Sequence, residues 1–388
     1  FISGAEVTPD VNWDVKSEKI DADGIIYGII PESQDQLQQI KKVIRTSSKN
    51  CKRFIFAFPK HFQAIDKISL EYAAVTQLRD HAIDDPILFD EYEVVFEDLQ
   101  EVINDFIGTY THPENYRSFY IYNGELMNIH RKSGLTELMS KICDEVYCLT
   151  PVINNESVNK NDITRIAQNS RNKIIGALLR SELEPNLGLS GTGQEVSIMR
   201  STLFRTGIWN EDSGIPQMNL HPKDVAMQNM LKTIEDFILE ARQNGQVNFG
   251  VLYERLTSPE YHIGLRYGLI PIYLAAVMHN YRQQTVINDR FGPVQTSVDV
   301  LVQINSEPGN FTLEYLDWNP EKERYIKRLA EAFADYVVDA EKAGNSYDYV
   351  ATAMRRWYMA LPKYSKEIIK HPTGERILRQ QLEMIKLL

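Results

Sequence analysis

Two uninterrupted apolar segments near the start of the chain most constrain its fold. Residues 25–30 read Ile-Ile-Tyr-Gly-Ile-Ile, and residues 54–58 read Phe-Ile-Phe-Ala-Phe before Pro59. An amphipathic segment between them begins at Pro31-Glu32-Ser33 and carries Leu37, Ile40, Val43 and Ile44 on one side. Runs of this kind are typical of strands buried on both faces, and a strand–helix–strand crossover predicts a parallel pair.

This predicted parallel sheet has too few strands to be stable alone. Parallel strands need neighbours and helices on both faces, so we expect the remaining strands upstream of the chain or within its first twenty residues. The chain begins with Phe1 rather than methionine, and we expect its natural start to lie upstream.

After Lys60 the pattern changes to long helices, predicted over residues 62–83 and 87–108. Apolar residues recur in the second at the spacing of one helix face. A hairpin is expected at 119–122, followed by the turn signal Asn123-Gly124. The fold class is therefore mainly α (α+β), with a short α/β element at the N-terminus. The apolar positions of the second helix are Leu88, Tyr92, Val95, Leu99, Val102 and Phe106.

The remaining chain is predicted to be largely helical as well. Ser133 is expected to cap a helix running to Val146, and Asp162 one running to Leu179. Short strands at 284–288 and 311–316 flank a helix near 296–304, which together with the preceding helices predicts a winged-helix-like subdomain. Further helices are predicted at 193–207, 223–243, 248–256, 264–281, 319–343, 346–361 and from 373. The predicted domains are 1–60, a terminal βαβ; 61–148, a long-helix pair with a hairpin; 149–245, helical; 246–318, winged-helix-like; and 319–388, C-terminal helices.

Composition indicates a globular chain rather than a disordered or membrane-spanning one. Of 388 residues, 43% are hydrophobic and 24% charged, which is ordinary for globular proteins. The longest apolar run, residues 268–278, is about half the length needed to cross a bilayer. Cys51, Cys143 and Cys148 form no CxxC pair, and we expect reduced, partly buried thiols in a cytoplasmic protein.

The net charge of −11 argues against a chain that coats nucleic acid. Acidic residues greatly outnumber the single arginine over residues 79–105, whereas basic residues predominate over 355–379. Each segment can be a solvated helix face, or a charged surface that meets a partner or a neighbouring subunit.

No complete catalytic motif is found in the sequence. The loop Gly188-Leu-Ser-Gly-Thr-Gly193 resembles a phosphate loop, but Gln194 and Glu195 replace the lysine and the hydroxyl that phosphate and magnesium require. We interpret it as a loop leading into a helix, with Glu195 in the first turn. The eight histidines are scattered, and HExxH and GxSxG motifs are absent. An unrecognised hydrolase would need a pocket with strongly perturbed titratable groups.

Several basic residues are candidates for contacts with nucleic acid or a partner. Arg171 and Arg266, which is expected at the start of an apolar helix, can contact phosphate. Alternatively, either can be a buried arginine that satisfies helix-end carbonyls or an acid. The full set of contact candidates is Arg165, Arg171, Lys173, Arg266, Arg355 and Arg356.

Four stretches together resemble a known family. They are 149–161 (Leu-Thr-Pro-Val-Ile-Asn-Asn-Glu-Ser-Val-Asn-Lys-Asn), 186–190 (Asn-Leu-Gly-Leu-Ser) leading into Glu195-Val-Ser197, 256–271 (Leu-Thr-Ser-Pro-Glu-Tyr-His-Ile-Gly-Leu-Arg-Tyr-Gly-Leu-Ile-Pro), and 357–364 (Trp-Tyr-Met-Ala-Leu-Pro-Lys-Tyr). Their order resembles the region after the ATPase domain in large prokaryotic P-loop ATPases of phage-defence islands, including the P-loop protein of BREX systems. The strand–helix–strand at 25–60 is similar to the last βαβ of that ATPase core.

The resemblance implies a non-catalytic helical scaffold that couples nucleotide state to DNA or to partner subunits of a defence system. ATP and magnesium are implied for the parent protein, which would be an ATPase, with no cofactor bound in this fragment. No residue here matches the family's Walker A lysine or Walker B acids. A homo-oligomer is possible, and no membrane partner is expected. The alternative is a stand-alone nucleic-acid-binding or regulatory protein that uses the winged-helix-like subdomain.

Overall fold

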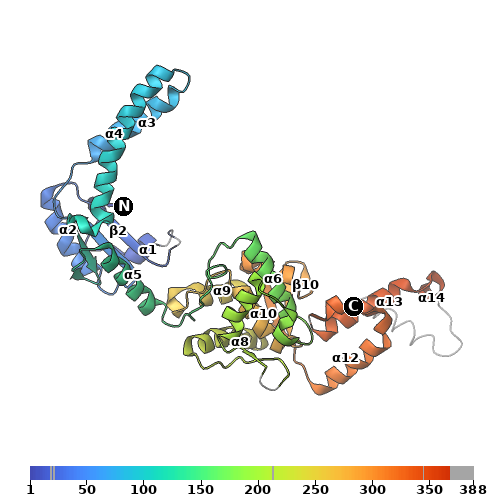
Figure 1. The fold of residues 1–388 in the computed structure, drawn as a ribbon. Coiled ribbons are helices and arrows are strands. Elements are labelled where there is room, and N and C mark those ends of the chain that lie inside the picture. The colour runs from blue at the N-terminus through green and yellow to red at the C-terminus, as the bar shows by residue number, and fades with distance from the viewer. Residues whose placement is uncertain (18–19, 21, 212–213, 344, 368–388) are drawn as a thin grey trace. The chain divides into compact units, whose positions relative to one another are not determined.

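The computed structural model describes residues 1–388 except 18–19, 21, 212–213, 344 and 368–388. The chain divides into two compact units, Phe1–Cys148 and Leu149–Leu388. Both are mainly helical with small sheets, so the predicted α+β class is confirmed (Figure 1). Within the described residues, no helix is both long and apolar enough to span a bilayer. The helix predicted from residue 373 lies outside the described residues, as do Lys370, Arg376 and Arg379 of the basic segment.

The first unit is built on the predicted strand–helix–strand. β2 (Ile25–Ile30) and β3 (Phe54–Pro59) pair in parallel, with Ile25 opposite Phe54 and Gly28 opposite Ala57. They are joined by α2 (Gln34–Ser47), whose residues Leu37, Ile40 and Ile44 are buried. The crossover was therefore correctly predicted from the two apolar segments.

The chain itself supplies the neighbours that these strands need: one strand lies within the first twenty residues, as one of the two expectations had it, and the others come from the later hairpin, which was not expected in this sheet. β1 (Ile2–Ser3) pairs in parallel with β2, and β4 (Ser118–Tyr122) pairs antiparallel with β3. β5 (Glu125–Met127) completes the order β1-β2-β3-β4-β5. Asn123 and Gly124 take φ values of 49° and 80°, because a two-residue hairpin turn requires positive φ at both positions. The predicted hairpin is thus confirmed, but its place in this sheet was missed.

Burial differs between the two parallel strands. β3 is buried at every position, as expected, whereas Ile26 of β2 is 39% exposed. Trp13, in α1 (Trp13–Ser17), packs on Phe56 with ring centroids 4.5 Å apart and closes one side of the sheet core.

Two long helices follow the sheet. α3 (Asp66–His81) and α4 (Pro86–Thr111) pack against each other as an antiparallel pair that projects from the sheet (Figure 1). Asp85 caps α4 by accepting hydrogen bonds from the amides of Ile87 and Leu88. α5 (Lys132–Val146) follows the hairpin, but Arg131 and not the predicted Ser133 is its N-cap. Cys143 and Cys148 are exposed, which corrects the expectation that they are partly buried.

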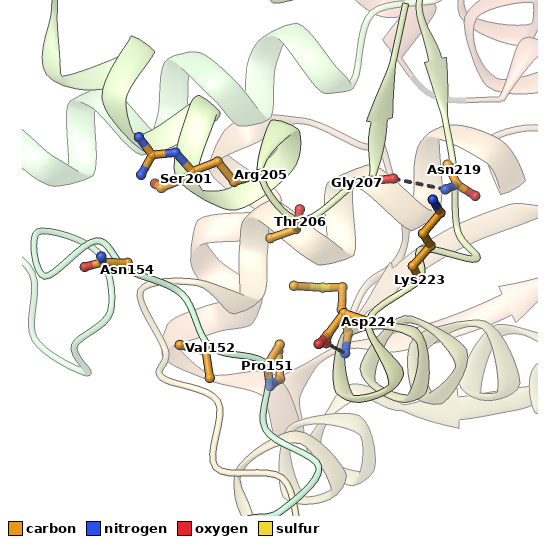
Figure 2. A pocket seen from close by; sticks show the side chains of 11 residues that line it. Pro151, Val152, Asn154, Ser201, Arg205, Thr206, Gly207, Asn219, Lys223 and Asp224 are labelled. Carbon is orange, nitrogen blue, oxygen red and sulfur yellow. Dashed lines mark hydrogen bonds between the residues drawn. The ribbon is translucent and has the colours of Figure 1, made fainter. Parts of the chain in front are cut away.

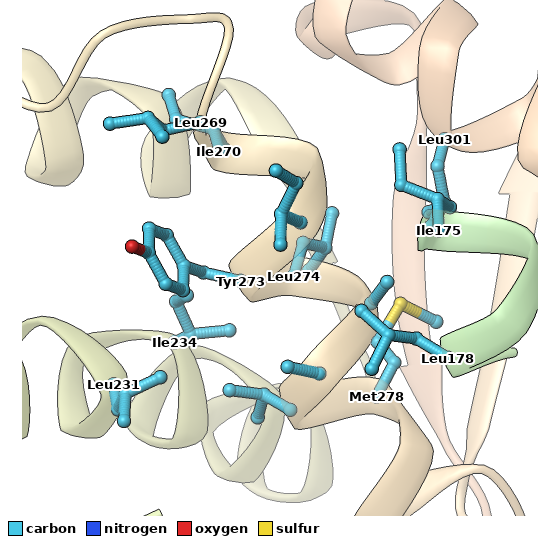
Figure 3. Close-up of a cluster of buried hydrophobic side chains, with 14 of the residues drawn as sticks. Ile175, Leu178, Leu231, Ile234, Leu269, Ile270, Tyr273, Leu274, Met278 and Leu301 are labelled. Carbon is cyan, nitrogen blue, oxygen red and sulfur yellow. The ribbon is translucent and has the colours of Figure 1, made fainter. Parts of the chain in front are cut away.

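The second unit is organised around α10 (Ile270–Tyr281). Every residue of this helix from Ile270 to Met278 is buried, so it forms the centre of the core. Figure 3 shows α10 between Leu231 and Ile234 of α8 (Val225–Asn244) and Leu178 of α6 (Arg165–Leu178). Thr164, rather than the predicted Asp162, caps α6.

A four-stranded antiparallel sheet covers part of this core in the order β10-β9-β11-β8. The strands predicted at 284–288 and 311–316 and the helix between them are confirmed. The corresponding elements are β8 (Gln246–Asn248), α9 (Phe249–Thr257), β9 (Thr285–Asp289), β10 (Gly292–Val294), α11 (Val298–Ser306) and β11 (Thr312–Tyr315).

A winged helix reads DNA through an exposed helix beside its sheet. Here the helix in that position, α10, has no exposed face between Ile270 and Met278. The predicted winged-helix-like subdomain is therefore not confirmed.

The remaining elements refine the predicted boundaries. The helix predicted at 264–281 begins only at Ile270, so Arg266 lies four residues before it. The helix predicted over 319–343 ends at Ala332, and two short 3₁₀ segments follow. The other elements are α7 (Gln194–Met199), continued by a π-helical turn Arg200–Phe204, then β6 (Trp209–Asn210), β7 (Gln217–Met218), α12 (Pro320–Ala332), α13 (Ser346–Ala360) and α14 (Lys363–Glu367).

Candidate interaction surface

The α3–α4 pair is held together by an aromatic contact between its helices. The rings of Tyr72 and Phe96 stack with centroids 5.0 Å apart. The Arg79 guanidinium lies 3.9 Å from the Phe96 ring centroid and donates a hydrogen bond of 3.2 Å to Glu93. Because a cation is attracted to an aromatic face, this cluster joins the two helices without a fully buried core.

The base of the pair is anchored to the sheet. Phe106 and Tyr110 are buried, and the Tyr110 hydroxyl donates a hydrogen bond of 3.1 Å to the backbone oxygen of Ile29. Burial raises the pKa of Tyr110, so this hydroxyl stays protonated and keeps donating. Asp105 pairs with Arg117 at 2.6 Å beside this anchor. One end of α4 is therefore fixed, while the rest extends away from the sheet.

Beyond the anchor, α4 leaves a row of apolar side chains uncovered. Leu88, Val95 and Val102 are 38%, 45% and 44% exposed, respectively. They recur every seven residues, so they lie along one line of the helix. At 1.5 Å per residue the line is about 21 Å long. We call these three residues the α4 row.

The α4 row is bordered by carboxylates. Glu91 follows Leu88 by three residues and Asp98 follows Val95 by three, and residues three apart are surface neighbours on a helix. Neither acid forms an ion pair with any residue that the structure describes. An apolar line with an acidic border is complementary to an amphipathic helix that carries lysine or arginine beside its apolar face.

Two of the predicted contact candidates are engaged in ion pairs. The Lys173 ammonium lies 2.9 Å from Glu195, whose place in the first turn of α7 matches the prediction. This ion pair lowers the pKa of Glu195. Arg356 forms two hydrogen bonds with Glu341 and a third, of 3.0 Å, with the backbone oxygen of Tyr336.

The other candidates do not converge on one site. Arg165 and Arg355 are exposed, and Arg266 is half-buried. Arg171 is only 4% exposed, as the buried-arginine interpretation predicts, and burial lowers its pKa. However, its one hydrogen bond within the described residues is a long one of 3.5 Å to the side chain of Asn172. The acid or carbonyl partner expected for a buried arginine is thus not found among those residues.

The sequence pattern identified the residues of the α4 row but not their exposure. Leu88, Val95 and Val102 belong to the same apolar stripe as Tyr92, Leu99 and Phe106, but Tyr92 and Leu99 are half-buried and Phe106 is buried in the core beside the sheet. Among the described residues, no group of three or more His, Cys, Asp and Glu side chains is arranged to hold a metal ion.

Comparison with models of known families, with curated proteins and with solved structures finds no match to this chain.

Proposed function

We propose that this chain is a non-catalytic interaction region of a larger, cytoplasmic, ATP-dependent phage-defence protein, and that the α3–α4 pair docks a partner subunit. The observation that carries the docking role is the α4 row, three aliphatic side chains exposed in line on a projecting helix. The sequence resemblance alone suggests the ATPase and defence context.

The α4 row favours a helical protein partner over DNA. Its border is acidic, and like-charge repulsion opposes the approach of a phosphate backbone. A partner helix with basic residues beside an apolar face would bury Leu88, Val95 and Val102 and neutralise Glu91 and Asp98. Because the helix pair is fixed at its base by Tyr110, movement of a docked partner would reach the sheet.

Adjacent valines provide a matched test. Val95 is in the α4 row, whereas Val94 is 61% exposed and points away from that row. In cells carrying the complete defence system, we expect V95S to weaken co-purification of the system's own subunits and to reduce protection against phage. V94S should preserve both. Removing a valine from a buried interface costs roughly 1–2 kcal/mol, so affinity should fall about five- to thirty-fold.

Two outcomes would contradict parts of the proposal. Equal effects of V95S and V94S, or no effect of either, would exclude the α4 row as the docking surface. A complete reading frame without a G-x-x-x-x-G-K-[ST] motif would remove the ATPase context.

A further inference from the structure

A pocket of about 510 Å³ lies within the second unit. Three chain segments line it: the loop with Pro151, Val152 and Asn154, the end of the π-helical turn, and the start of α8. Figure 2 shows Thr206 between Arg205 on one side and Lys223 on the other. This volume is in the range of small-molecule sites.

The pocket walls are held by hydrogen bonds from its own lining segments. The side-chain amide of Asn155 donates a hydrogen bond of 2.9 Å to the Ser201 hydroxyl, which joins the loop to the π-helical turn. Asn219 donates through its side chain to the backbone oxygen of Gly207 at 3.0 Å. Asp224 accepts a hydrogen bond of 2.7 Å from the Met227 amide. The pocket is therefore largely pre-formed, as ligand sites usually are.

The backbone beside the pocket departs from regular helix. The Arg205 amide donates to the Arg200 oxygen at 2.9 Å, a bond that spans five residues rather than four. Such π turns are frequent at functional sites. The Ile208 amide donates to the Leu203 oxygen at 3.1 Å as part of the helix C-cap, in which Gly207 has a φ of 74°. Here the π turn is followed directly by Arg205 and Thr206, which line the pocket.

The charge of the lining is positive. Arg205 and Lys223 are exposed cations at the rim, and neither forms an ion pair with any residue that the structure describes. The one acid in the lining, Asp224, is already engaged as the N-cap of α8. Figure 2 shows the two side chains on opposite sides of Thr206, with the Arg205 guanidinium directed away from Lys223. Because both side chains are exposed, their rotation would bring the two charges toward an anion near Thr206. Val152, which is 93% exposed, adds apolar surface, and the buried residues Pro151 and Met227 lie beneath it.

We propose that this pocket binds a small molecule that has a phosphate group and an apolar body. Arg205 and Lys223 would contact the phosphate, because two cations match the two negative charges of a phosphate better than they match the single charge of a carboxylate. The apolar body would lie against the exposed side chain of Val152. This site belongs to the second unit and does not depend on the docking role of the α3–α4 pair.

Isothermal titration of the full chain at fixed salt tests the proposal, with phenyl phosphate, inorganic phosphate and phenol as probes. We expect saturable one-to-one binding of phenyl phosphate, weaker binding of inorganic phosphate and none of phenol. R205Q and K223Q should each weaken phenyl phosphate binding about ten-fold or more, since each removes a charged hydrogen-bond donor. R165Q is the matched control, because Arg165 is an exposed arginine of the same unit outside the pocket lining.

Three outcomes would overturn the proposal. The first is the absence of saturable phenyl phosphate binding at millimolar concentration. The second is an R165Q variant that weakens binding as much as R205Q, which would indicate non-specific attraction. The third is inorganic phosphate that binds as tightly as phenyl phosphate, which would remove the apolar part of the site. Unchanged circular dichroism of each variant confirms that a loss reports on the pocket and not on folding.

Discussion

Replacing Arg171 with methionine should make the second unit more stable. Arg171 is 4% exposed, and the one hydrogen bond of its guanidinium to a described residue is 3.5 Å long. Burial of a charged group costs several kcal/mol when no close partner compensates it. Methionine keeps an unbranched chain of similar length that can fill the same space.

The expected gain follows from the lost desolvation penalty. Replacing buried charged groups with apolar residues of similar volume has stabilised proteins by about 1–4 kcal/mol. Part of the gain will be offset by imperfect packing, so we expect about 1–3 kcal/mol. For a unit of this size, spanning residues 149–388, each kcal/mol moves the melting temperature by about 2–4 °C. The melting temperature should therefore rise by about 2–12 °C.

Hydrogen exchange of the α6 amides in the full chain gives the unfolding free energy of this unit directly. R165M, an exposed arginine on the same helix, should change that free energy by less than about 0.5 kcal/mol. If R171M instead destabilised α6 by more than 1 kcal/mol, roughly the worth of one hydrogen bond, the guanidinium would have partners that the contacts described above do not include.

Three further predictions concern other parts of the fold. Burial lowers the pKa of His279 in the folded chain. Below the unfolded pKa of about 6.5, the unfolded chain binds a proton that the folded chain binds less readily. The free energy of unfolding should therefore decrease as the pH falls. H279Q should flatten this loss between pH 7.5 and 5.5 in urea unfolding. G268A places a methyl group against the backbone oxygen of Val158 and should cost about 1–3 kcal/mol, whereas G309A, which has open space, should be tolerated in a thermal melt. F96A removes the ring that Arg79 covers and should accelerate limited proteolysis within 66–111 while leaving the second unit intact.

Local patterns predicted the elements of the fold well. The two apolar segments at 25–30 and 54–58 gave a parallel pair with its crossover helix, because an uninterrupted apolar run flanking an amphipathic segment leaves few alternatives. Asn123-Gly124 gave the hairpin, because both positions need positive φ. Each of these signals lies within a few residues of the structure it predicts.

Pairing between distant segments was not predictable in the same way. The hairpin strand β4 pairs with β3 across about sixty intervening residues, and no local signal specifies that partner. The same limit applies to the pocket, whose walls come from residues 151–154, 201–207 and 219–227. Arg205 and Lys223 belong to no sequence motif, and only the fold brings them to the rim of the same pocket.

The width of an apolar stripe can nevertheless be compared with the number of helices available to cover it. The stripe of α4 includes Tyr92, Leu99 and Phe106 beside the α4 row, and alternating spacings of four and three residues join the six positions into one seam. α3 contacts α4 through Tyr72 and Phe96, and Phe96 lies outside that seam. The α4 row is therefore left to solvent, at a cost of roughly 25 cal/mol for each Å² of apolar surface, or to a second helix. Because the exposed line keeps a seven-residue repeat bordered by Glu91 and Asp98, a second helix with apolar residues at the same repeat and basic neighbours would pack along it as the third helix of a bundle.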